Sequence, residues 1–73
     1  MTKALHTEGY GRFLKRLKEA RDSSGLTQVQ VAKKLGLHQS YVSKIESGER
    51  RVDAVELERL AKIYGKSITY FIK

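Results

Sequence analysis

The chain has 73 residues, and its 15 Lys plus Arg outnumber 8 Asp plus Glu to give a formal net charge of +7 at pH 7. This length allows one small domain with one core, which disfavours most enzymes. The chain has no cysteine and 2 histidines, so disulfides, thiolate metal sites and a closed histidine metal site are excluded, and no cofactor is expected. The excess of positive charge indicates a polyanionic partner, with nucleic acid ahead of an anionic membrane. No apolar run is long enough for a transmembrane segment or a signal peptide, which predicts a cytoplasmic protein without a membrane partner.

The spacing of apolar residues predicts helices along most of the chain. Residues 1–8 lack such a pattern and are expected to form a flexible N-terminal arm. From residue 9 onward apolar residues recur at intervals of three and four, which is typical of amphipathic helices. Single glycines follow the periodic segments, where a left-handed residue commonly ends a helix. The expected helices span about residues 9–23, 28–35, 39–47, 55–64 and 68–72.

Polar residues mark the expected helix starts. Thr27 and Gln30 fit a capping box, in which each side chain bonds the backbone N–H of the other residue. Asp53 and Glu56 form the acidic equivalent and also face the positive end of the helix dipole. Apolar residues alternate in the last segment, 67–72, so it is either a short strand or a final helix.

The two short helices at 28–35 and 39–47 are separated by only three residues. Neither would be stable alone in water, so their neighbours must hold them in place. Ala32 is small enough for a close crossing of two helices, and Gly36 allows a sharp turn. The second helix of this pair is expected to present hydrogen-bonding side chains to solvent.

Residues 26–50, LTQVQVAKKLGLHQSYVSKIESGER, resemble the helix-turn-helix of the Xre-type, lambda-repressor-like DNA-binding proteins. The similarity extends over roughly residues 10–72. It implies an all-α, compact five-helix domain over 9–73, with the helix-turn-helix in its second and third helices and no small-molecule ligand domain. The chain is similar, more narrowly, to controller proteins of restriction–modification systems, although small phage Cro-like proteins and antitoxins share most of these motifs.

The resemblance implies that the helix at 39–47 enters the major groove as a recognition helix, while the helix at 28–35 crosses the DNA backbone. The residue types fit this geometry, because Gln39 can bond adenine N6 and N7 together and Lys44 can reach guanine or a phosphate. The alternative is an ordinary solvated helix face. The expected base contacts are Gln39, Ser40, Ser43, Lys44 and His38.

His38 occupies the cap position of the recognition helix, where the family usually carries Ser or Thr. Either its ring nitrogen caps the helix weakly, or the side chain of Ser40 or Gln39 takes over this role. Contact of His38 with a base or a phosphate remains open beside these roles.

Side chains around the recognition helix are expected to hold the protein on the DNA backbone. Gln28, at a helix N-terminus, can offer its amide and the helix-end N–H to one phosphate. Two adjacent arginines follow the recognition helix, although they are also compatible with a solvated loop. The expected phosphate contacts are Gln28, Tyr41, Arg50 and Arg51.

The family resemblance also places Arg21 opposite Glu46 as a partly buried ion pair that fixes the recognition helix against the first helix. The alternative is two unrelated surface charges.

The C-terminal part, 55–72, carries more apolar surface than a small core can absorb. One recognition helix reads only about four to six base pairs, so proteins of this build normally bind as two-fold dimers. Leu57, Leu60 and Phe71 are expected to close the monomer core instead. The expected dimer interface consists of Val55, Ile63, Tyr64, Ile68, Tyr70 and Ile72.

The sequence therefore predicts a regulator of transcription that binds double-stranded DNA as a homodimer on a pseudo-palindromic operator. Such a dimer can occlude a promoter or contact RNA polymerase. No Ser, His and acid set and no glycine-rich phosphate loop supports an enzyme. An antitoxin that binds both operator DNA and a toxin protein is the alternative function.

Overall fold

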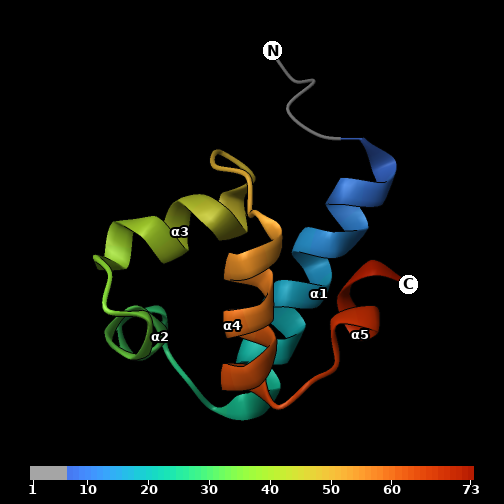
Figure 1. The fold of residues 1–73 in the computed structure, drawn as a ribbon. Helices are drawn as coiled ribbons and strands as arrows, with labels where there is room; N and C mark the ends of the chain where they lie inside the picture. Colours follow the sequence, from blue (N-terminus) through green and yellow to red (C-terminus); the bar gives the residue numbers. More distant parts are fainter. Residues whose placement is uncertain (1–6) are drawn as a thin grey trace.

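The computed structural model describes residues 7–73, and this part of the chain is entirely helical (Figure 1). Its elements are α1 (Glu8–Ser24), α2 (Gln28–Leu35), α3 (Gln39–Ser47), α4 (Ala54–Tyr64) and α5 (Ile68–Ile72). The segment that alternates in sequence is thus a helix. Residues 1–6 of the expected arm lie outside the described residues.

The start of α1 corrects the expected boundary of the N-terminal arm. Thr7 is the N-cap, and its hydroxyl accepts the backbone N–H of Tyr10 at 3.2 Å, while Glu8 already belongs to the helix. The cap satisfies one of the free N–H groups of the first turn, and the Glu8 carboxylate favours the positive end of the helix dipole. These two residues therefore belong to the folded domain.

The predicted caps account for most of the other helix ends. Both capping boxes are present, Thr27 with Gln30 at the start of α2 and Asp53 with Glu56 at the start of α4. Gly36 ends α2 with φ of +72°, a left-handed conformation that a side chain would strain. At α5 the Ser67 hydroxyl contacts Thr69 and makes no cap, so this short helix depends on tertiary packing.

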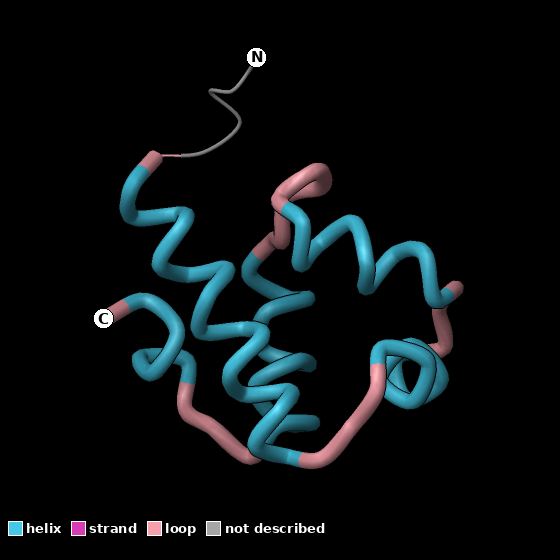
Figure 2. Tube along the Cα trace, turned by 180° about the vertical axis from the view of Figure 1, so that it is seen from behind, coloured by secondary structure: helices cyan, strands magenta, loops and turns pink. Residues whose placement is uncertain are grey.

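The core lies where all five helices meet. Figures 1 and 2 show α2 and α3 on one side of the α1–α4 pair and α5 on the other. Small residues allow the close approach of helices, since Ala20 in α1 and Ala32 in α2 are both almost fully buried. The remaining buried core residues are hydrophobic or aromatic: Phe13, Leu14, Leu17, Val31, Leu35, Val42, Ile45, Leu60, Ala61, Tyr64 and Phe71.

The last helix is fixed to the first by one buried ring and one arginine. Phe71 is 1% exposed, and Arg16 donates to the backbone carbonyl of Tyr70 at 2.6 Å. The same guanidinium lies 5.5 Å from the centre of the Tyr70 ring, a distance at which a cation is attracted to the ring. Arg16 thus orders α5. None of the helices in residues 7–73 is long and apolar enough to cross a membrane.

Candidate nucleic-acid interface

The chain between α2 and α3 is a three-residue turn, Gly36–His38. The Gly36 N–H bonds the Lys33 carbonyl at 3.1 Å, and the Leu37 N–H bonds the Ala32 carbonyl at 2.9 Å. These bonds satisfy two carbonyls in the last turn of α2, and α2 and α3 then pack against each other at an angle (Figure 1). Two short helices joined in this way form a helix-turn-helix.

The outer face of α3 carries the polar side chains that the sequence predicted for base contact. Val42 and Ile45 point into the core, and the residues between and before them face solvent. The exposed set is His38, Gln39, Ser40, Ser43 and Lys44. All five predicted base-contact residues are therefore accessible to a ligand.

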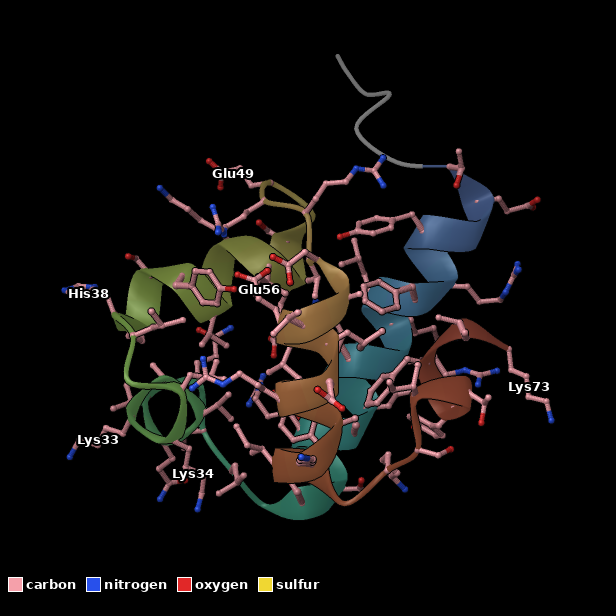
Figure 3. All side chains as sticks on the ribbon, viewed as in Figure 1. Lys33, Lys34, His38, Glu49, Glu56 and Lys73 are labelled. Carbon is pink, nitrogen blue, oxygen red and sulfur yellow. The ribbon has the colours of Figure 1, made fainter. Side chains whose placement is uncertain are left out.

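His38 caps α3 through a ring nitrogen, which is the first of the two predicted alternatives. Nδ1 accepts the backbone N–H of Ser40 at 3.5 Å and lies 3.2 Å from the Ser40 hydroxyl. The backbone bond is long, so the cap is weak. In the tautomer that makes this cap, Nδ1 accepts the backbone hydrogen and Nε2 carries the ring hydrogen. The ring extends away from the protein in Figure 3, so this Nε2–H can donate to a ligand.

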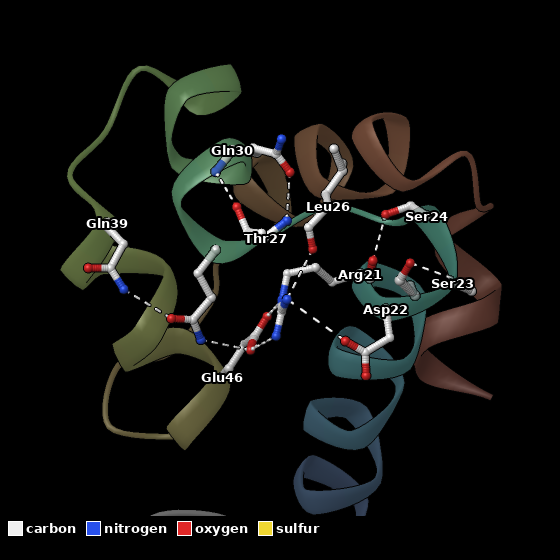
Figure 4. Close-up of polar contacts among 11 residues, drawn as sticks. Arg21, Asp22, Ser23, Ser24, Leu26, Thr27, Gln30, Gln39 and Glu46 are labelled. Atoms are coloured by element: carbon white, nitrogen blue, oxygen red, sulfur yellow. Dashed lines mark hydrogen bonds and ion pairs between the residues drawn. The ribbon is translucent and has the colours of Figure 1, made fainter.

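The predicted ion pair of Arg21 and Glu46 is present, and two hydrogen bonds join the side chains (Figure 4). Arg21 Nε donates to Glu46 Oε2 at 2.6 Å, and Arg21 Nη2 donates to Glu46 Oε1 at 3.1 Å. The side chain of Glu46 is 4% exposed and that of Arg21 is 17% exposed. Arg21 Nη1 also bonds the Leu26 carbonyl at 3.0 Å. The pair therefore ties α3 to α1 and to the segment before α2, and the bond to Glu46 raises the pKa of Arg21.

The side chain of Gln28 forms hydrogen bonds with two other side chains of the protein. Its Nε2 donates to Glu46 Oε1 at 3.0 Å, and its Oε1 accepts from Gln39 Nε2 at 3.0 Å. An amide nitrogen carries two hydrogens, so one hydrogen remains for a phosphate. The sequence placed Gln28 at the interface but did not indicate that it joins the recognition helix to a buried carboxylate.

The structure leaves the Tyr41 hydroxyl inaccessible for the predicted contact with a phosphate. The Tyr41 hydroxyl is buried and makes no hydrogen bond of good geometry, although it lies beside Glu56 and Arg50, because this side of α3 faces the start of α4 and not the solvent. Burial raises the pKa of Tyr41 to about 12, and the nearby Glu56 carboxylate acts in the same direction. What Tyr41 offers instead is its ring, which lies 4.8 Å below the guanidinium of Arg50.

Both predicted arginines lie on aromatic rings at the edge of this surface. Arg50 pairs with Glu56 at 3.4 Å and remains half exposed, while Arg51 is exposed and its guanidinium lies 4.4 Å from the centre of the Tyr10 ring. Stacking on a ring restricts a long side chain and so lowers the entropy cost of binding an anion. The two cations are thus ordered at the end of α3, and a phosphate can approach them from solvent.

One positioning arginine gave no signal in the sequence. Arg59 Nη2 donates to the carbonyl of Leu35 at 2.8 Å and so holds the C-terminus of α2 against α4. In sequence Arg59 is one of many charges on an exposed helix face, and only the packing of α4 against α2 gives it this role.

The predicted dimer surface is only partly available. Val55 is 67% exposed, Ile72 63% and Ile68 39%, whereas Ile63 and Tyr70 are partly buried against the core. Tyr64 was expected there, but it is 6% exposed and belongs to the monomer core. Its face of α4 turns toward the Arg21–Glu46 pair, and burial raises its pKa to about 12.

Comparisons with known proteins agree with this geometry. The family model for the helix-turn-helix matches residues 17–71. A solved structure, an XRE-family like protein from Pseudomonas syringae pv. tomato strain DC3000, superposes with a TM-score of 0.81 at 38% identity, covering 97% of this chain and 89% of that chain. The chain belongs to the Xre-type helix-turn-helix family, whose members are DNA-binding transcriptional regulators and not enzymes.

Two curated proteins are similar over most of this chain. The HTH-type transcriptional regulator ImmR of Bacillus subtilis (strain 168) is 38% identical over 58 residues, which are 80% of this chain and 46% of that protein. The HTH-type transcriptional regulator PrpR of Mycobacterium tuberculosis (strain ATCC 25618 / H37Rv) is 39% identical over 56 residues, 77% of this chain and 12% of that protein. The chain thus spans less than half the length of either relative.

Proposed function

We propose that the chain binds double-stranded DNA sequence-specifically, as a homodimer on a pseudo-palindromic operator, and thereby regulates transcription. The observation that carries this proposal is the exposed polar face of α3, whose Gln39 is held by a hydrogen bond to Gln28 of α2. A base-reading side chain fixed before binding loses less entropy when it meets the base.

Cations beside this face support contact with the DNA backbone. Arg50 and Arg51 lie in the loop directly after the C-terminal end of α3. With a net charge of +7, the domain is expected to gain much of its affinity from counterion release. Operator binding should therefore weaken steeply as salt rises.

Exposed apolar residues on α4 and α5 support a dimer. Val55, Ile68 and Ile72 are exposed on α4 and α5 and not on α2 or α3, so two copies can meet through these helices while both recognition helices stay free. Two-fold symmetry would place the half-sites about one helical turn, or roughly 10 base pairs, apart. Such a dimer, acting in the cytoplasm, would occlude a promoter or contact RNA polymerase from an adjacent site.

The narrower role of a restriction–modification controller rests on the sequence resemblance alone. The identity of the genes beside the operator would test it.

Selection of bound sequences from random double-stranded DNA tests the proposed function. A palindromic consensus is expected, and the absence of any enriched sequence would contradict direct readout. Gln39→Ala should relax the preference at one base pair of each half-site. Arg51→Ala should instead weaken all sequences alike and lower the salt slope by about one per protomer. Equal effects of the two substitutions would contradict the assignment of base and phosphate contacts.

A further inference from the structure

A tyrosine of the first helix holds the loop between α3 and α4, residues 48–53. The Tyr10 hydroxyl accepts the backbone N–H of Val52, 42 residues away in sequence, at 3.3 Å. The guanidinium of Arg51 lies 4.4 Å from the centre of the Tyr10 ring. One side chain of α1 thus contacts two successive residues of the loop, the side chain of the first and the backbone of the second.

The Tyr10 ring is itself fixed to the core of the domain. Its centre lies 5.1 Å from that of the Phe13 ring, one turn further along α1, and Phe13 is 9% exposed. Tyr10 is partly buried against the same core, and a packed side chain keeps one orientation. The position of the Arg51 guanidinium is therefore determined by the core through Tyr10, and not by the loop alone.

The two arginines of the loop differ in what their charges contact. Arg50 lies over Tyr41 of α3 and also pairs with the Glu56 carboxylate at 3.4 Å, so a phosphate must compete with a carboxylate for it. The contact of Arg51 with Tyr10 brings no negative charge, because a ring attracts a cation through its quadrupole. At this contact Arg51 is held in place without a competing anion.

We propose that Tyr10 is a positioning residue for DNA binding, which fixes Arg51 for contact with a phosphate. This inference rests on the proposed function of DNA binding. The ring directs the Arg51 side chain, and the hydroxyl holds the loop backbone at Val52. An arginine that is ordered before binding loses less side-chain entropy when it meets a phosphate. Because phosphates carry no sequence information, Tyr10 should change the affinity for all sequences alike.

Tyr10→Leu and Tyr10→Phe separate the ring from the hydroxyl. Affinities are measured for an operator duplex and a random duplex, under conditions where circular dichroism shows that each variant is folded. Tyr10→Leu should weaken both by at least about five-fold, because a dimer would lose an ordered arginine twice. Tyr10→Phe keeps the ring and should stay within about two-fold of the wild type. Leu57→Ala, a change in another partly buried residue, controls for lost stability and should retain the wild-type affinity.

An Arg51→Ala background shows whether Tyr10 acts through Arg51. In this background Tyr10→Leu should change the affinity by less than about two-fold, because the side chain that it positions is missing. A loss as large as in the wild-type background would overturn the inference. A loss confined to the operator duplex would also overturn it, since a phosphate contact is blind to sequence.

The order of Arg51 can be measured on the free protein, independently of DNA. NMR relaxation of the Arg51 Nε–H group reports its motion on the picosecond to nanosecond timescale. We expect a restricted guanidinium in the wild type and in Tyr10→Phe, and a mobile one in Tyr10→Leu. Equal mobility in the wild type and Tyr10→Leu would overturn the positioning role while DNA binding stands. A wild-type protein that binds neither duplex would overturn the proposed function and the positioning role together.

Discussion

Tyr41 carries a polar atom that the fold leaves without a partner. Its hydroxyl is buried and unbonded next to the Arg50–Glu56 pair, and such a group costs about 1–3 kcal/mol. We expect Tyr41→Phe to stabilise the domain by about 1 kcal/mol, which corresponds to a rise in Tm of about 4–8 °C at this size. DNA affinity should stay within about two-fold, because the hydroxyl does not reach the surface. Thermal unfolding and operator titration measure both.

The same substitution at Tyr10 provides the control for Tyr41. Tyr10 Oη accepts the backbone N–H of Val52 at 3.3 Å, so Tyr10→Phe should lower the Tm. A lower Tm for Tyr41→Phe as well would mean that its hydroxyl is bonded after all, for example to Glu56.

Tyr64 gives the stability of the domain a dependence on high pH. Burial raises its pKa to about 12, whereas the unfolded chain ionises a tyrosine near 10. The folded state therefore holds the Tyr64 proton more tightly than the unfolded chain does. This difference stabilises the fold fully below about pH 10, and the stabilisation is lost as the pH rises toward about 12. Urea unfolding at pH 8 to 11 should therefore show a decline that begins near 10. Tyr64→Phe should make the decline shallower, and an unchanged profile would show that Tyr64 does not cause it.

At the scale of elements, α3 is anchored by a buried ion pair as well as by apolar packing. Arg21→Met would leave the Glu46 carboxylate, 4% exposed, without its counter-charge, and we expect a loss of about 3–5 kcal/mol. The double variant Arg21→Met with Glu46→Leu should recover most of this loss, because an apolar pair of similar size carries no desolvation cost. Denaturant titration measures both variants. A single variant as stable as the wild type would contradict the anchoring role.

The helix boundaries were predictable from the sequence because local signals mark them. Capping boxes start α2 and α4, and their positions in sequence alone place these helices within about one residue of the observed starts. The state of 67–72 was not predictable, because its five-residue helix lacks a side-chain cap. It is helical because Phe71 fills the core and Arg16 bonds the Tyr70 carbonyl, and both are tertiary contacts.

At the scale of the whole molecule, the exposed apolar residues of α4 and α5 predict a dimer. Val55→Asp and Ile72→Asp alter side chains that are 67% and 63% exposed, so the stability of the monomer should change by no more than about 0.5 kcal/mol. Each should instead abolish self-association, which sedimentation at micromolar concentration measures.

Val29→Asp is the control for the dimer surface. Val29 is also apolar and 51% exposed, but it lies on α2. This variant should sediment like the wild type. A wild type that remains an 8.3 kDa monomer at micromolar concentration would contradict the proposed dimer.

The sequence by itself determined the first four helices, the capping boxes of α2 and α4, the accessible face of α3 and the family, because each follows from local spacing or from a continuous motif. The tertiary structure decided the environment of individual side chains. The Tyr41 hydroxyl and the Tyr64 side chain are buried and not on the surface where the sequence placed them, because the packing of neighbouring helices decides which side of a helix is covered. Gln28 became the link between a buried carboxylate and Gln39. Such hydrogen-bond partners lie 11 to 25 residues apart in the chain, and only packing brings them together.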